Sequence, residues 1–151
     1  MLEQAIAAAA GFLLAVLWFD LMFDVQVYRH RASAVLPEDV LASIAAYYRR
    51  VTTTASPMGR LVGLVMVVLL GCVVAQAIDG DVPFHVSFAS ILFTLLATGV
   101  ALVRVVPAAR RVGARTDSVE TQSRLVWGIF NAHVASIVAI SLVLAMQLIG
   151  A

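Results

Sequence analysis

The sequence contains no lysine, a single cysteine and few charged residues. All ten basic residues are arginine, and only 13% of the 151 residues are charged, whereas soluble domains average about 25%. Nine acidic residues leave a net charge of +1. This near-neutral composition excludes a polybasic nucleic-acid-binding protein, so we expect no nucleic-acid partner. It also excludes a disordered chain, because 62% of the residues are apolar.

Familiar catalytic motifs are missing as well. The lone Cys72 lies within an apolar run, so it has no partner for an intrachain disulfide and no cysteine-based metal spacing. The chain has no phosphate-binding loop, no HExxH helix and no GxSxG turn. The sequence therefore predicts no metal site and leaves the cofactor, if there is one, unknown.

Long apolar segments are the main feature that is present. A membrane-spanning helix needs about 20 mostly apolar residues, and its backbone must be satisfied internally. Four segments qualify, at about 5–28, 58–78, 82–106 and 122–149. The first lacks the basic start of a signal peptide, so we expect it to remain in the mature protein. We predict an all-α integral membrane four-helix bundle, with 1–151 as a single transmembrane domain.

The arginines are distributed unevenly along the chain. All ten lie in or beside the two long connections, between the first and second spans and between the third and fourth. The opposite side carries the acidic residues Glu3, Asp79 and Asp81. The positive-inside rule then places both long connections in the cytoplasm and both termini outside. We expect a multi-pass protein of the bacterial inner membrane, with the lipid bilayer as its main partner.

The first long connection contains a predicted helix at about 37–52. Its apolar residues recur at helical spacing and share one face; they are Val40, Ile44, Tyr47, Tyr48 and Val51. We predict an interfacial amphipathic helix that lies on the cytoplasmic surface of the membrane; the alternative is that it packs against the end of the bundle.

Asp20 and Asp24 are the only formal charges well inside a span. A carboxylate at the bilayer centre costs about 2.5–3.5 kcal/mol on insertion scales, so such residues are candidate functional groups. Their spacing of four residues places both on one helix face, where two ionised carboxylates would repel each other. We therefore consider them candidate catalytic residues. Alternatively, they form structural ion pairs with charge partners, for which the candidates are Arg60, Arg104 and Arg124.

Matching depths in the membrane suggests neighbours for this pair. Thr98, Asn131 and His133 lie at similar levels on other spans, and we predict them to be ligand-binding residues together with Trp18 and Trp127 as walls. Asn131 and His133 are about 200° apart on one helix and cannot both point inward. Asn131 borders a stripe of small residues, which favours Asn131 as the inward group.

Gly59 and Gly63 form a GxxxG pattern in the second span. This pattern allows close helix packing, either inside the bundle or between two copies in a homo-oligomer.

Several short motifs resemble those of the anthrone-oxygenase-like group of small four-span bacterial membrane proteins. These motifs are the aromatic end of the first span (Trp18, Phe19, Phe23), Leu36-Pro37 before Tyr47-Tyr48, and the prolines Pro57 and Pro107. The resemblance covers most of the chain in layout. It implies a four-span fold and an oxygenase-like or redox role.

Three classes of function follow from these observations. The first is a membrane protein that binds an apolar or aromatic ligand at the Asp-centred site, in an oxygenase-like or redox role. The second is an accessory subunit of a larger membrane complex. The third is a proton- or cation-coupled transporter that works as an oligomer.

Overall fold

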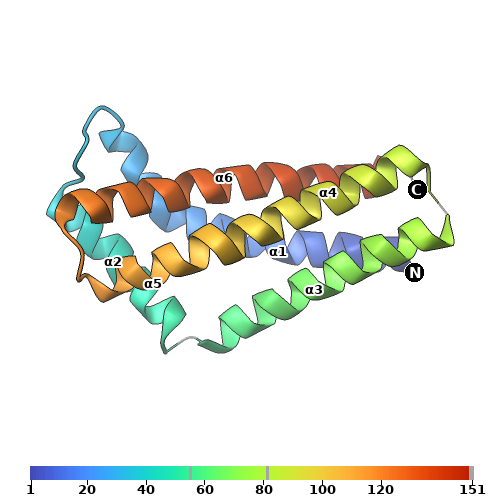
Figure 1. The fold of residues 1–151 in the computed structure, drawn as a ribbon, viewed down its shortest axis with the longest axis horizontal. Helices are drawn as coiled ribbons and strands as arrows, with labels where there is room; N and C mark the ends of the chain where they lie inside the picture. Colours follow the sequence, from blue (N-terminus) through green and yellow to red (C-terminus); the bar gives the residue numbers. More distant parts are fainter. Residues whose placement is uncertain (55, 81, 150–151) are drawn as a thin grey trace.

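The computed structural model describes residues 1–54, 56–80 and 82–149, and the elements in these ranges are all helical (Figure 1). In chain order they are α1 (Leu2–Asp24), the 3-10 helix η1 (Val25–His30), α2 (Glu38–Thr52), α3 (Ser56–Asp79), α4 (Phe84–Val100), the π-helix η2 (Ala101–Val105), α5 (Val106–Ala114) and α6 (Val119–Ile149). Asp81, one of the acidic residues assigned to the outer side, is outside the described residues.

Four helical stretches are long and apolar enough to cross a membrane, as predicted. They are Leu2–His30, Pro57–Asp79, Phe84–Ala114 and Val119–Ile149. α6 packs against α1 and α4, and α3 packs against the same two helices, so the four form a ring. Figure 1 shows them running side by side along the long axis of the molecule. Buried residues of α1, α3, α4 and α6, among them Ile6, Leu69 and Val143, form the apolar core of the half that holds both termini.

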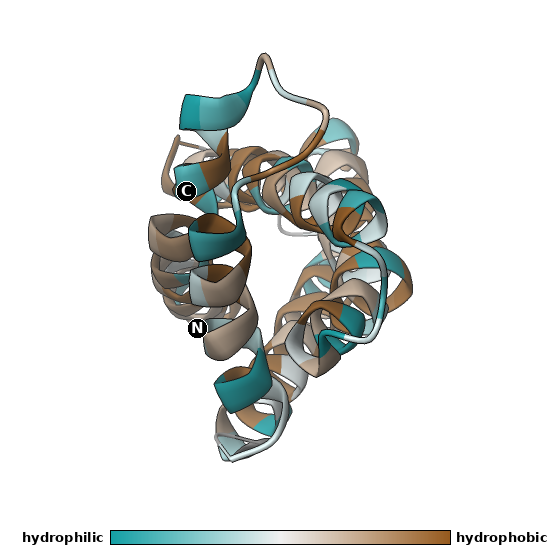
Figure 2. Cartoon of the chain, turned by 90° about the vertical axis from the view of Figure 1, so that its left-hand side faces the viewer, coloured by the Kyte–Doolittle hydropathy of each residue, from teal (hydrophilic) through white to brown (hydrophobic). Residues whose placement is uncertain are grey.

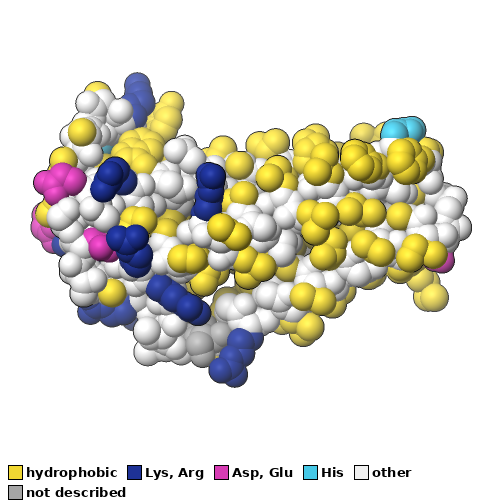
Figure 3. Space-filling model, viewed as in Figure 1, with side chains coloured by type: hydrophobic (Ala, Val, Ile, Leu, Met, Phe, Trp, Pro, Cys, Tyr) yellow, Lys and Arg dark blue, Asp and Glu magenta, His cyan; other side chains and the backbone are white. Residues whose placement is uncertain are grey.

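The arginines gather at the opposite end, which we call the arginine end. Figure 3 shows their side chains around α2 and the neighbouring helix ends, while hydrophobic side chains are the most common coloured type over the rest of the visible face. Figure 2 views this end directly and shows hydrophilic residues in η1 and at the near helix ends. This sorting of charge matches the uneven distribution along the sequence.

α2 packs against the end of the bundle, mainly on α5 and also on α6. Its predicted apolar face is buried or half-buried, and Leu41 and Ala45 extend that face. The two helices approach closely at Gly113, where an added Cβ would lie 2.9 Å from the backbone nitrogen of Arg49. Arg49 Nε also donates a hydrogen bond to the Gly113 carbonyl oxygen at 3.1 Å. These contacts place α2 on the end of the bundle.

The third spanning stretch continues past its predicted end near residue 106. Pro107 has no N–H to donate, and its ring crowds the preceding turn of an α-helix. Here the preceding turn is the π-helix η2, and the chain then continues as α5 to Ala114. A π-helix widens the turn, so the helix accommodates the proline without ending.

The GxxxG pattern does not mediate close packing inside this chain, contrary to one of the two predictions for it. A Cβ added at Gly59 or Gly63 would meet no atom within 4 Å. Both glycines instead line a cavity between α3 and the neighbouring helices. α3 is held in the bundle by Leu69 and Val73 in its second half, which are buried. Its first three turns carry mostly exposed side chains.

A polar contact closes the half of the bundle that holds the termini. Gln76 on α3 and Gln147 on α6 exchange two amide hydrogen bonds of 3.0 and 3.1 Å. Gln147 Nε2 also lies 3.5 Å from Ser90 Oγ on α4. All three side chains are buried. They connect three helices in a region where an unpaired amide would be costly.

Candidate functional site

Asp24 is the most deeply buried charged residue that the structure describes, with 0% of its surface exposed. Its two carboxylate oxygens have different partners. The Tyr48 hydroxyl donates a hydrogen bond to Oδ1 at 2.7 Å, and Nδ1 of His133 lies 2.6 Å from Oδ2. α1, α2 and α6 thus meet at one carboxylate.

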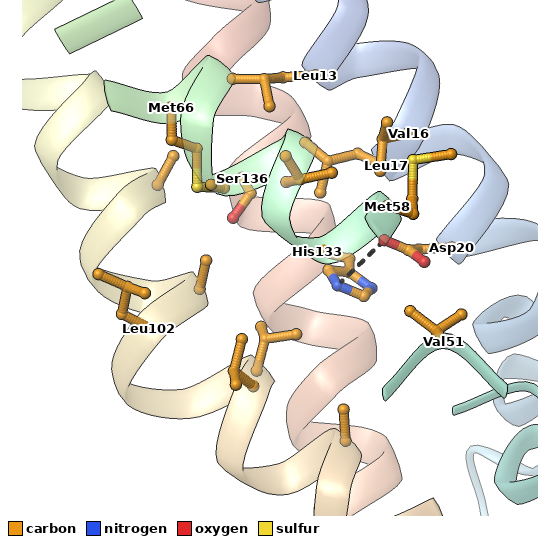
Figure 4. A pocket seen from close by; sticks show the side chains of 18 of the residues that line it. Leu13, Val16, Leu17, Asp20, Val51, Met58, Met66, Leu102, His133 and Ser136 are labelled. Carbon is orange, nitrogen blue, oxygen red and sulfur yellow. Dashed lines mark ion pairs between the residues drawn. The ribbon is translucent and has the colours of Figure 1, made fainter. Parts of the chain in front are cut away.

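His133 is held between the two aspartates. An ionised Asp24 can only accept at Oδ2, so a neutral imidazole that pairs with it carries its proton on Nδ1 and its lone pair on Nε2. Nε2 lies 3.9 Å from Asp20 Oδ2. Figure 4 shows the ring and the Asp20 carboxylate facing each other at one wall of the cavity. One nitrogen is therefore fixed by Asp24, and the other is directed toward Asp20.

Asp20 has a tyrosine partner of its own. The Tyr47 hydroxyl donates a short hydrogen bond to Asp20 Oδ1. The Tyr47 ring stacks on Phe23 with a centroid distance of 4.1 Å and meets the edge of Tyr48 at 5.2 Å. These contacts hold the two adjacent tyrosines in place over the two carboxylates. The side chain of Asp20 retains 17% exposure, in contrast to Asp24.

Burial raises the pKa of both tyrosines above the ordinary value. For Tyr48 the neighbouring Asp24 charge adds to this effect, and for Tyr47 the hydrogen bond to Asp20 does so. Phenolate formation beside a carboxylate is unfavourable, so both hydroxyls stay protonated and remain hydrogen-bond donors at neutral pH.

A cavity of about 640 Å³ lies beside this cluster and is lined by α1, α2, α3, α4, η2, α5 and α6. Its polar lining lies toward the arginine end, and its other end is apolar. The polar residues at that end are Asp20, Tyr47, Tyr48, Thr52, Arg60, Arg110 and His133, and Thr98 and Ser136 also belong to the lining. The apolar end includes Leu13, Leu69 and Ile140. A volume in this range is typical of sites for small molecules.

Among the predicted ligand-binding residues, Thr98 and His133 line the cavity and three others do not. Asn131 is exposed on the outer face of α6, whereas His133 is only 4% exposed. The preference for Asn131 as the inward group was wrong. Trp18 is 63% exposed, and Trp127 packs against the apolar core below α2, so neither is a cavity wall.

The predicted arginine partners of the aspartates are also not in contact with them. Within the described part of the chain, no arginine lies within ion-pair distance of Asp20 or Asp24. Arg60 lines the cavity, Arg104 is exposed, and Arg124 donates to Thr121 Oγ1 at 3.2 Å. Hydroxyl and imidazole groups satisfy the carboxylates instead, because α2 brings its tyrosines over them.

Two features of this site were not predicted. Tyr47 and Tyr48 were assigned only to the apolar face of α2, and their hydroxyls bind the aspartates. The inward position of His133 follows a spacing of alternately four and three residues along α6. The members of this line are Gln122, Val126, Ile129, His133, Ser136, Ile140, Val143 and Gln147, all buried. Polar residues within an apolar span mark its interior face, so this line was the signal that identifies His133.

The His, Cys, Asp and Glu side chains in ranges 1–54, 56–80 and 82–149 include no group of three placed to hold a metal ion. Comparison with protein-family models, curated proteins and solved structures gave no match.

Proposed function

We propose that this chain is a membrane protein that binds a small, mainly apolar molecule in the cavity and exchanges a proton with it at His133. The observation that carries the proposal is the imidazole ring, which Asp24 holds at Nδ1 and which directs Nε2 toward Asp20 at the cavity wall. A neutral imidazole oriented by a buried carboxylate is a suitable general base.

Each member of the cluster has a distinct role in this proposal. Asp24 and Tyr48 position His133, because Asp24 accepts from both. His133 takes a proton from an acidic group of the ligand. Asp20 then stabilises the resulting imidazolium across the 3.9 Å gap to Nε2. General acid–base catalysis of this type contributes roughly 10²–10⁴-fold to a rate.

The type of reaction is proposed from the family resemblance, and the location in the cell is proposed from the charge distribution. The anthrone-oxygenase-like layout implies an oxygenase-like or redox role for the proton transfer. The positive-inside rule supports a bacterial inner membrane protein with the arginine end in the cytoplasm and both termini outside. In that orientation α2 lies at the inner surface, and the cavity belongs to the inner half of the membrane.

The test uses anthrone, a three-ring ketone with an acidic CH₂ group, and protein in lipid nanodiscs. Proton NMR in D₂O measures how fast the CH₂ protons exchange for deuterium. Wild-type protein should accelerate exchange, and His133→Gln should lose at least about 100-fold of that acceleration. Gln retains an N–H for Asp24, so the variant should fold, which a thermal unfolding scan verifies.

Asn131→Gln is the matched control, since it alters an exposed polar residue on the same helix. It should exchange anthrone as fast as wild-type protein does. Equal rates for His133→Gln and wild-type protein, with both folded, would overturn the proposed role of His133.

A proton-coupled transporter is a second candidate, and a second cavity favours it. A space of about 320 Å³ at the terminal end is lined by Met1, Leu2, Glu3, Gln76 and Asp79. The apolar core of that half lies between the two cavities. The same two variants in liposomes separate the candidates: proton flux that depends on His133 supports transport, and exchange of anthrone without flux supports ligand chemistry.

A further inference from the structure

We infer that the cavity takes an amphipathic anion, with its charged group between Arg60 and Arg110 and its apolar body toward the middle of the membrane. This inference rests on the proposed function, since it names the class of molecule that the same cavity binds. It is carried by the positions of charge and apolar surface around the cavity.

Two arginines with exposed side chains line the cavity on different helices. Arg60 lies near the start of α3, and Arg110 lies in α5. Among the described residues neither forms an ion pair, and Glu38 and Asp117 of this end pair with Arg115 and Arg111 instead. Two cations that form no ion pair thus line the polar end of the cavity, which also holds the Asp20 carboxylate, and most of the remaining lining is apolar. An anion placed there forms charge-assisted hydrogen bonds with guanidinium groups.

The start of α3 adds to the positive potential. Its first turns carry the partial positive charge of a helix amino end, and Met58 and Gly59 of this segment line the cavity. A Cβ at Gly59 or Gly63 would meet nothing within 4 Å, so space for a ligand adjoins the α3 backbone. The helix end and the arginines act in the same direction.

The rest of the cavity is suited to an apolar body. Leu13, Leu69 and Ile140 are buried side chains at its far end. The cavity follows α3 from Met58 to Leu69, a distance of roughly 16 Å at 1.5 Å per residue. A volume of about 640 Å³ is of the size that holds a single drug-sized molecule. The size of the cavity therefore favours an anion with a fused-ring body or a single acyl chain over a phospholipid with two acyl chains.

The test compares two fluorescent probes of similar shape, anthracene-9-carboxylate and 9-anthracenemethanol. Each is titrated against protein in phosphatidylcholine nanodiscs, and empty nanodiscs correct for partition into lipid. We expect Arg60→Gln/Arg110→Gln to raise the Kd of the carboxylate at least about tenfold. The Kd of the alcohol should change less than about twofold.

The matched control is Arg104→Gln/Arg124→Gln, which removes the same charge from two arginines that are likewise exposed but do not line the cavity. An equal loss of carboxylate affinity in this control would show that the affinity depends on the overall positive charge of the protein, and would overturn the inference. Unchanged carboxylate affinity in Arg60→Gln/Arg110→Gln, with the alcohol still bound, overturns the inference and leaves the proposed function standing. Failure of both probes to bind wild-type protein overturns the proposed function as well.

A final arm identifies the source of the anion. Phosphatidylglycerol replaces part of the phosphatidylcholine, at about 0.5 M salt to screen the surface potential. Carboxylate binding should be unaffected. Competition by phosphatidylglycerol would show that a lipid headgroup occupies the arginine pair, and would overturn the assignment to a free amphipathic anion.

Discussion

Gly113→Ala should separate α2 from α5 and disturb the site, although the substitution adds only one methyl group. The new Cβ would lie 2.9 Å from the Arg49 nitrogen, 3.0 Å from its Cα and 3.2 Å from the Tyr48 carbonyl carbon. All three are backbone atoms, so no side-chain rotation relieves the contacts. Because Tyr48 belongs to the displaced segment, its hydrogen bond to Asp24 would be strained at the same time.

The magnitude follows from two opposing effects. Replacing a helical glycine by alanine stabilises a helix by up to about 1 kcal/mol. Overpacking against atoms that cannot move away costs about 1–3 kcal/mol. Gly128→Ala in α6 provides the control, because its Cβ would meet nothing within 4 Å. The difference in unfolding free energy between the two variants therefore isolates the steric cost, and we expect Gly113→Ala to be the less stable by about 1–3 kcal/mol.

The assay is reversible unfolding in mixed detergent micelles, followed by circular dichroism. Binding of anthracene-9-carboxylate is measured on the same samples, since displaced tyrosines would alter the cavity wall. Equal unfolding free energies for Gly113→Ala and Gly128→Ala would refute the close packing of α2 on α5.

Two further predictions concern buried polar groups. Gln147→Leu should destabilise the protein by about 1–3 kcal/mol, because it leaves the buried Gln76 amide unpaired, whereas Gln76→Leu/Gln147→Leu should be close to neutral. Unfolding of the single and double variants in detergent would measure this non-additivity, and additive losses would contradict the pairing. Folding raises the pKa of Tyr47 and Tyr48, so their stabilising contribution is complete below the unfolded pKa of about 10 and falls as the pH rises above it. In Tyr28→Phe protein, which retains only these two tyrosines, absorbance at 295 nm should show no phenolate until the protein unfolds; early phenolate in folded protein would argue against the buried placement.

The four spans were predictable because the bilayer imposes a simple rule on composition. A run of about 20 apolar residues without charge can only be a spanning helix, whatever its neighbours are. The helix at 38–52 was predictable for a similar reason, since its apolar face recurs at the helical period. The sequence also singled out Asp20 and Asp24, because a charge inside a span is costly wherever the other helices lie.

Which side chains contact one another in the site depends on the orientation of each helix about its own axis. The local sequence does not specify this orientation. The small-residue stripe on α6 pointed to Asn131, yet the helix turns His133 inward, where Asp24 compensates the burial of its ring. Arginines were the expected partners of the aspartates by charge. The packing of α2 at Gly113 instead places two tyrosine hydroxyls there.

The sequence was thus sufficient to predict helices long and apolar enough to span a membrane, the end that carries the arginines, and the two unusual carboxylates. Each of these predictions follows from the solvation cost of single residues or runs. The three-dimensional packing was needed to show what those carboxylates bind, that η2 continues the third long helical stretch through Pro107, and that Arg60 and Arg110 line one cavity. These features depend on distances between segments far apart in the chain, which are set by packing of the whole bundle.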